Sequence, residues 1–287
     1  ENVAAIDYFT RALALTPESD LETRYALHLA RQDVYHLQGK SQEEEQDLNA
    51  LQTLADQLQD QVRQAQVVHL HAIYLIRLGN YSLAIEKAQA AVALADAIGR
   101  EDVKVDAIGT LVNANYRQGD NAAVFHNGEP GLALARRLGA REFEGHLLFF
   151  LGLATMEQKN PAAARTHFEQ SLAIFQAIGN PRREGQAWLN LGFVASEEAR
   201  YAAAQHFFER ALALARQVGH RISESTALNN LGFLAGRLGD FKLARRYCDQ
   251  NLRIDREIDN RSGETYALMN LSLYTGMMGD HSAALEA

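Results

Sequence analysis

Residues 189–207 read LNLGFVASEEARYAAAQHF, and residues 228–247 read LNNLGFLAGRLGDFKLARRY. The triplet Leu-Gly-Phe that begins at Leu191 recurs at Leu231. Self-similarity at a fixed period of about 20 to 50 residues is the sequence signature of repeat architectures. We therefore expect the spacing from Leu191 to Leu231 to organise the rest of the chain.

Rows of this spacing, written from Leu21 onward, align six complete rows and part of a seventh without a gap. One column is rich in glycine: Gly39, Gly79, Gly119, Lys159, Ala199, Gly239 and Gly279. The next column is polar: Lys40, Asn80, Asp120, Asn160, Arg200, Asp240 and Asp280. A second glycine closes four of the rows: Gly99, Gly139, Gly179 and Gly219. These columns predict turns at two fixed places in each row.

Each row contains two amphipathic helical patterns. In the fifth row, small and apolar residues recur at i, i+3, i+4 and i+7 in two runs: Ala187, Trp188, Leu191, Gly192, Val194 and Ala195, then Ala204, Phe207, Phe208, Ala211, Leu212 and Leu214. Glycine between the runs permits the left-handed conformation that closes a helix, and Asn or Asp can cap the next one. No row carries the alternating pattern of a strand. We predict an all-α solenoid of antiparallel helix pairs, because one pair cannot bury its apolar face alone.

The fifth row resembles the tetratricopeptide repeat, whose residues W-x-x-L-G, A, F and A it carries at Trp188, Leu191, Gly192, Ala204, Phe208 and Ala211. The opening half-row matches at Ala5, Phe9 and Ala12 and ends on Pro17. Later rows lack that proline, so the second helix can extend to the glycine, which lengthens the period from the usual 34. This long variant is similar to the repeats of Leu-Gly-Asn spindle-orientation proteins and kinesin light chains, and to the helical arms of bacterial signalling ATPases.

The resemblance covers the whole chain and implies a right-handed superhelix over residues 1–287. It divides the chain into the second helix of a truncated repeat (1–20), six repeats (21–60, 61–100, 101–140, 141–180, 181–220 and 221–260) and a truncated last repeat (261–287). The chain begins without Met and ends in mid-pattern, at HSAALEA. We therefore expect a fragment of a longer protein.

The composition limits the classes of partner. The net charge is −8, and residues 1–60 hold 12 acidic against 4 basic residues, whereas the other 24 acidic and 24 basic residues cancel. Without a basic stripe to neutralise phosphates, we expect no nucleic-acid partner. No stretch approaches the roughly 20 apolar residues of a membrane span, and the N-terminus lacks a signal peptide, so we expect no membrane partner either. Glu43, Glu44 and Glu45 are interpreted as a solvated helix face rather than a docking patch.

The sequence carries no pattern typical of catalysis. H-E-x-x-H, the phosphate-binding G-x-x-x-x-G-K-[ST] and G-x-S-x-G are all missing from the chain. His69 and His71 point to different faces of one helix, whereas His167 and His206 fall in adjacent columns of neighbouring rows. Cys248 takes the place of a core phenylalanine, and as the single cysteine it favours a reducing cytoplasm. We expect a non-enzymatic protein without cofactor or metal.

In a tetratricopeptide stack the first helices line the concave side, so their inward columns imply the binding surface. From the fourth row onward these columns become apolar and aromatic: Phe149, Leu153, Met156, Phe193, Phe233, Met269 and Leu273. Exposed apolar strips mark interaction sites. We predict that this strip contacts a partner, while the alternative is that Phe193 and Phe233 pack across to the next first helix.

Asparagines accompany the strip, at Asn190, Asn230 and Asn270, with Asn229 inside it. An amide can pair with a peptide N–H and C=O at once. In related peptide-binding proteins an asparagine ladder holds the ligand backbone, which the resemblance implies for this chain. The alternatives are that these amides bond loop carbonyls of the neighbouring repeat, or that they have no special role.

One second helix departs from its pattern at Gly128, Pro130 and Gly131. Pro130 removes a helix hydrogen bond, and glycine costs about 1 kcal/mol against alanine. We predict a kink or short break there, interpreted either as a tolerated irregularity on the convex side or as a hinge.

Together these features predict a protein-interaction scaffold that binds a peptide, a helix or a partner domain in its concave groove. The family resemblance suggests the regulatory or sensory arm of a larger bacterial signalling protein. The alternative is a structural spacer or self-assembly element that associates through its uncapped ends. A small-molecule ligand in the groove stays open.

Overall fold

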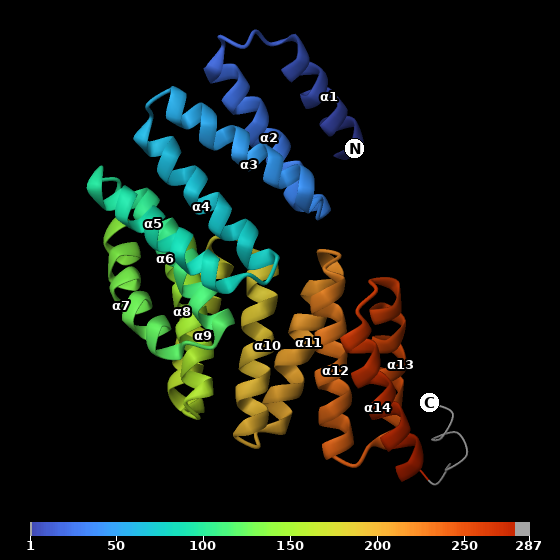
Figure 1. Ribbon diagram of the computed structural model, residues 1–287. Helices are drawn as coiled ribbons and strands as arrows, with labels where there is room; N and C mark the ends of the chain where they lie inside the picture. The colour runs from blue at the N-terminus through green and yellow to red at the C-terminus, as the bar shows by residue number, and fades with distance from the viewer. Residues whose placement is uncertain (1, 279–287) are drawn as a thin grey trace. The chain divides into compact units, whose positions relative to one another are not determined.

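The computed structural model describes residues 2–278, in which every regular element is an α-helix (Figure 1). The chain divides into two compact units, residues 1–143 and 144–287. The first unit contains α1 (Asn2–Leu15), α2 (Leu21–Gln38), α3 (Ser41–Gln57), α4 (Gln61–Arg77), α5 (Tyr81–Ala97), α6 (Glu101–Gln118) and α7 (Asn121–Leu138). The second unit contains most of α8 (Arg141–Glu157), then α9 (Pro161–Ala177), α10 (Pro181–Glu197), α11 (Tyr201–Gln217), α12 (Arg221–Arg237), α13 (Phe241–Glu257) and α14 (Arg261–Met277).

Each complete row holds one first helix and one second helix, as the sequence predicts. The chain folds as an all-α solenoid of helix pairs. The predicted turn at Gly279 and Asp280 and the residues after it lie outside the described part of the chain.

The turns share one backbone conformation. Gly39, Gly119 and the other turn glycines have φ between 66° and 84°, in the left-handed region. Four turns place a different residue there, and its φ is still 54° to 57°: Gln59, Lys159, Ala199 and Asp259. An L-residue in this region is strained by its Cβ, by about 1–2 kcal/mol. The geometry of the repeat therefore overrides the preference of the residue.

Most turns end in a side-chain cap, which confirms the role predicted for the polar column. The Oδ1 atom of Asp120 accepts a hydrogen bond from the Ala123 N–H at 2.9 Å, and Asp240 accepts one from Leu243 at 3.0 Å. Lys40 and Arg200 occupy the same column without a side-chain cap. Capped helices therefore begin at the same place in successive rows.

The glycine of the Leu-Gly motif makes room for a ring on the second helix of the same row. A Cβ built on Gly192 would lie 2.5 Å from the Phe208 ring, and one on Gly152 would lie 2.7 Å from Phe168. Both rings are at most 2% exposed. In the next row the buried Cys248 replaces the ring, and a Cβ on Gly232 would lie 3.3 Å from its sulfur. The small residue on one helix is thus matched to the large residue on the other.

The third row inverts this arrangement, which explains the glycines of α7. Gly128 occupies the position that Phe168 has one row later, and Val112 occupies the position of Gly152. Val112 and Gly128 are both buried. Gly131 lies in the same way opposite the column of the buried Val105. By the repeat pattern, the larger residue of each pair of columns stands on the first helix in this row, and the glycine stands on the second.

The predicted short break at Pro130 is not found, because α7 continues from Asn121 to Leu138 with Pro130 inside it. Proline removes one backbone hydrogen bond of the helix, and the alternative of a kink stays a prediction. Gly128 and Gly131 are both buried, and their interpretation as a tolerated irregularity or a hinge stays untested.

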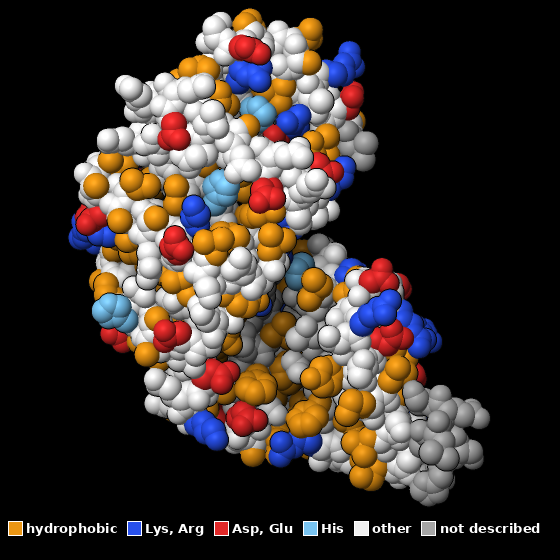
Figure 2. All heavy atoms as spheres, viewed as in Figure 1, with side chains coloured by type: hydrophobic (Ala, Val, Ile, Leu, Met, Phe, Trp, Pro, Cys, Tyr) orange, Lys and Arg blue, Asp and Glu red, His pale blue; other side chains and the backbone are white. Residues whose placement is uncertain are grey.

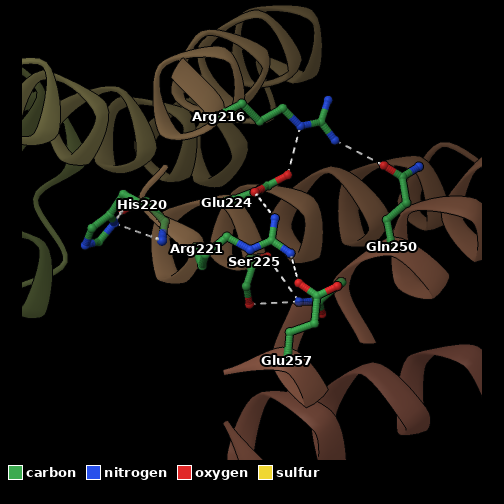
Figure 3. Close-up of polar contacts among 9 residues, drawn as sticks. Arg216, His220, Arg221, Glu224, Ser225, Gln250 and Glu257 are labelled. Atoms are coloured by element: carbon green, nitrogen blue, oxygen red, sulfur yellow. Dashed lines mark hydrogen bonds and ion pairs between the residues drawn. The ribbon is translucent and has the colours of Figure 1, made fainter. Parts of the chain in front are cut away.

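A polar contact between residues eight positions apart bridges successive helices across many turns. In the second unit the basic or amide side chain comes first: Gln176 bonds Glu184 at 3.1 Å, Arg216 bonds Glu224 at 2.9 Å, and Arg256 bonds Glu264 at 2.7 Å. Figure 3 shows Arg216 between Glu224 and Gln250, and Arg221 between Glu224 and Glu257.

The first unit reverses the order of charge in this contact. Asp56 accepts from Gln64 at 2.9 Å, and Asp96 pairs with Lys104. The order in the second unit suits the helix dipoles, because arginine ends one helix and glutamate begins the next. The order of Asp96 and Lys104 in the first unit opposes them, whereas the neutral Gln64 meets Asp56 through a hydrogen bond alone.

One residue of the acidic run in α3 is buried, whereas Glu45 is exposed as predicted. Glu44 is 1% exposed, accepts hydrogen bonds from Gln32 and His36, and pairs with Arg77. Asp47 is also 1% exposed. Arg31 and His28 hold it from α2, at 2.7 Å and 2.8 Å. The interpretation of residues 43–45 as solvated is therefore wrong for Glu44, because three neighbouring side chains compensate its buried charge.

Replacing Ala199 by glycine tests the left-handed turns. The change removes a Cβ strain of about 1–2 kcal/mol, offset by about 0.5–1 kcal/mol of chain entropy. We expect Ala199→Gly to raise the free energy of unfolding by about 0.5 kcal/mol, measured by urea denaturation. The control Ala213→Gly lies in the exposed interior of α11 and should lower it by about 1 kcal/mol. Equal losses in both variants would contradict the turn geometry.

A double-mutant cycle tests the inverted row. Val112→Ala leaves a cavity, and Gly128→Ala overpacks the same interface, so each change should destabilise the protein by about 1–3 kcal/mol. The double variant recreates the pair Ala72 and Ala88 of the second row, both buried. We expect the double variant to be more stable than the sum of the single effects by at least about 0.5 kcal/mol. Additive losses would show that the two residues do not share one space.

Candidate functional site

The first helices of the second unit present a common surface, which we name the first-helix face. It consists of corresponding side chains on α10, α12 and α14, and these helices adjoin one another within the unit. Each helix turns its small and aliphatic residues toward the second helix of its own row. The residues on the opposite side are therefore left to face away from the core.

Four predicted residues of this face are apolar and about half exposed or more: Phe193 at 47%, Phe233 at 48%, Leu273 at 51% and Met269 at 62%. Hydrophobic side chains gather over α10 to α14 in Figure 2. About half of Phe193 and of Phe233 meets solvent and the rest is covered, so the alternative in which they pack across to the next first helix stays open.

Two exposed residues of α14 extend this surface and are missing from the sequence prediction. Tyr266 is 64% exposed and Met277 is 59% exposed. They lie on the side of α14 that carries Met269 and Leu273. The rows before them have Gln186 and Thr226 in the column of Tyr266, so the column looked polar. Helical spacing from Met269 would have found both residues.

The structure places the earlier part of the predicted strip differently. Phe149 is 9% exposed and packs edge to face against Phe150 and Phe168. Leu153 and Met156 are half-buried. The expectation that Phe149 begins an open strip is therefore corrected, because its ring joins the aromatic packing of α8 and α9. The exposed residues begin at Phe193.

The asparagines form local contacts and leave hydrogen-bonding capacity unused. The Nδ2 atom of Asn190 donates to the Gln186 carbonyl of its own helix at 2.9 Å. Asn270 on α14 donates to the Asn229 amide oxygen on α12 at 3.4 Å. Asn230 makes no side-chain hydrogen bond to another described residue. The bonds of Asn190 and Asn270 do not go to loop carbonyls, which was the structural role considered for them.

A cation lies beside the aromatic residues of this face. The Arg237 guanidinium stands 5.8 Å from the centre of the Phe233 ring and 5.5 Å from that of Tyr201. It also donates a hydrogen bond to the Tyr201 hydroxyl at 3.1 Å. Arg237 therefore holds a fixed position at the edge of the apolar surface.

The remaining titratable residues do not assemble a reaction centre in the described residues. No group of three or more His, Cys, Asp or Glu side chains there is placed to hold a metal ion. Cys248 is buried, and burial raises the pKa of its thiol to about 12, which keeps it protonated. The prediction of a core cysteine is confirmed.

Two histidines are half-buried, and burial shifts the pKa of each. Burial lowers the pKa of His69 to about 4, and its ring bonds the Thr110 hydroxyl at 2.7 Å. Burial, together with the positive charge of Arg183, lowers the pKa of His146 to about 3. Both rings are neutral at pH 7 and act as packing groups.

The family comparison agrees with this arrangement. The model of the Tetratricopeptide repeat family matches residues 144–217 and 223–287. These residues are tetratricopeptide repeats. The match covers the rows that contain α8 to α14, and it confirms the family that Trp188, Gly192 and Phe208 indicate. No curated protein matches the chain.

Solved structures share the fold at low sequence identity. A signal transduction ATPase with a tetratricopeptide repeat sensor, from Pyrococcus horikoshii, is 14% identical with a TM-score of 0.72 over 96% of this chain. The similarity covers 42% of that ATPase, so this chain spans less than half of its length. A Rap protein complexed with competence and sporulation factor is 13% identical, with a TM-score of 0.66 over 96% of this chain and 86% of its own.

A kinesin light chain with TPR-like repeats, from Podospora anserina, is 17% identical with a TM-score of 0.55. The similarity covers 68% of this chain and 96% of that one. At these identities the likeness establishes the fold.

None of the helices in the described range 2–278 is both long and apolar enough to span a membrane.

Protonation of His69 should destabilise the first unit in acid. The pKa of His69 falls from 6.5 to about 4 on folding, so the unfolded chain binds the proton more tightly and stability decreases as the pH drops from about 6.5 toward 4. The full effect is up to about 3 kcal/mol. We expect His69→Gln to reduce this loss, measured by urea denaturation at several pH values. The same pH dependence in both proteins would contradict the burial of a neutral His69.

Proposed function

We propose that this protein is an interaction scaffold whose first-helix face binds an apolar or amphipathic segment of a partner protein. The observation that carries the proposal is the exposure of Phe193, Phe233, Met269 and Leu273, at 47% to 62%, on three adjoining helices. Exposed apolar patches are uncommon on proteins that act alone and are typical of interaction sites. Aromatic side chains with an arginine beside them are also the residues that dominate binding energy at interfaces.

The asparagine side chains of this face can fix the orientation of a bound segment through hydrogen bonds to its backbone. Asn230 has no side-chain partner among the described residues, and Asn190 uses one of its two N–H groups. Each can donate to a peptide carbonyl while its own oxygen accepts a peptide N–H. In this proposal the apolar residues provide affinity, and Asn190, Asn230 and Asn270 read the backbone of the bound segment.

The related structures support a regulatory setting. One contains a tetratricopeptide repeat sensor joined to a signalling ATPase, and another is a Rap protein complexed with a factor. We place this chain, by analogy, in the sensory or regulatory arm of a larger bacterial signalling protein. Its single buried cysteine suits the reducing conditions of the cytoplasm.

The proposal is tested by affinity capture from the lysate of the source cell with wild type and with Phe193→Ser/Phe233→Ser. A partner that binds the first-helix face should be captured by wild type and not by the double variant. For the purified partner, calorimetry should show a loss of affinity of about 100-fold or more, because buried aromatic anchors contribute about 2 kcal/mol or more each. Circular dichroism confirms that both proteins are folded.

The matched control is Leu37→Ser/Leu78→Ser, since these leucines are 77% and 49% exposed outside the first-helix face. The control should retain the partner. Retention by both variants would place binding elsewhere. A mass that rises with protein concentration, measured by light scattering and abolished by neither variant, would favour the spacer or self-assembly alternative instead.

A further inference from the structure

The outer side of α13 carries a row of cations that no other second helix has. Lys242, Arg245, Arg246 and Arg253 are all exposed, and we name them the basic stripe. At about 1.5 Å per residue the stripe extends over roughly 17 Å of one helix face. Lys242, Arg246 and Arg253 are four and seven positions apart and lie on one side of α13, whereas Arg245 is turned from Arg246 by about 100° around the helix axis. The balanced charge of residues 61–287 conceals this row in the sequence.

The cations of the stripe lack partners within the chain. No ion pair joins any of the four to another residue in the described part of the molecule, whereas Arg216, Arg221 and Arg256 of the same unit are all paired. Arg165 occupies the position of Arg245 two rows earlier and pairs with Glu198 at 3.1 Å. The residue that corresponds to Glu198 in the later row is Met278. The stripe therefore retains a positive charge that the repeat pattern elsewhere neutralises.

An apolar pocket lies at the edge of the stripe. It has a volume of about 280 Å³ between α11, α12 and α13. Leu231, Leu234, Leu238, Leu243 and Tyr247 line most of it. Leu243 and Tyr247 belong to α13, three residues before and one residue after Arg246, and Gln205, Ala235 and Asp240 complete the lining. A pocket of this size has room for one large apolar side chain.

We propose that the basic stripe and this pocket dock an acidic helical segment of a partner protein, which inserts one large apolar side chain. Carboxylates three and four residues apart on the partner helix would follow the row of cations along α13. The surface is separate from the first-helix face, so the two sites can be occupied and tested independently.

Features of the surface favour an acidic protein segment over a phosphate polymer. Asp249 lies within the face of the stripe and interrupts its positive charge. Neither a nucleic acid nor a flat lipid surface fills a narrow pocket lined by leucines as an apolar side chain does.

The test uses a fluorescent helical peptide of about 12 residues, the length of the stripe, with glutamates along one face and one phenylalanine at its edge. We expect it to bind wild type in low salt. Arg246→Glu/Arg253→Glu should weaken binding about tenfold or more, and so should replacement of the peptide glutamates by glutamine. Replacement of its phenylalanine by alanine should weaken binding further.

The matched control Arg117→Glu/Lys159→Glu makes the same change of charge at exposed residues elsewhere and should bind normally. Phe193→Ser/Phe233→Ser should also bind normally, which separates this proposal from the function of the first-helix face. Absence of binding, or equal binding by the stripe variant, would overturn the proposal. So would tighter, stripe-dependent binding of oligothymidylate or of phosphatidylserine vesicles, both measured beside the peptide.

Discussion

The fit between a small residue on one helix and a large residue on its partner governs this structure. Gly192 leaves space for Phe208, and Gly152 leaves space for Phe168. The separation of two packed helices depends on the side chains at their contact, because protein interiors are packed to nearly constant density. The two columns therefore change together from row to row, from two buried alanines in the second row to glycine against a ring in the fourth and fifth.

This constraint explains what the sequence could and could not predict. The turns follow from single positions, so the glycine column located them, and Ala199 adopted the same left-handed conformation as glycine. The break expected at Pro130 came from considering α7 alone, while its glycines make sense only against Val105 and Val112 on α6. Glu44 was misjudged for the same reason, since its partners His36 and Arg77 lie on other helices. The repeat period aligns residues that occupy the same position in different rows. It does not show which residues at different positions contact one another.

The candidate surface was predicted in part. The columns of Phe193, Phe233 and Leu273 identified exposed apolar residues, because each first helix repeats its outward positions. Phe149 shares a column with Leu189, Asn229 and Met269 but is enclosed by aromatic neighbours of its own row. The basic stripe escaped notice because its charges are unique to α13. A residue pattern that occurs in only one row cannot be found by comparing equivalent positions across rows.

The reversed charge order in the cross-turn contacts limits how such a chain can evolve by duplication. Rows of one unit can be copied beside one another, since Arg216 with Glu224 and Arg256 with Glu264 have the same polarity. Unequal recombination between the two units would bring a helix that ends in arginine against one that begins with Lys104. Two like charges would meet wherever Lys104 is the new neighbour, whereas the neutral Gln64 would accept either order. Gain and loss of repeats should therefore be easier within the second unit than across a new junction at α6.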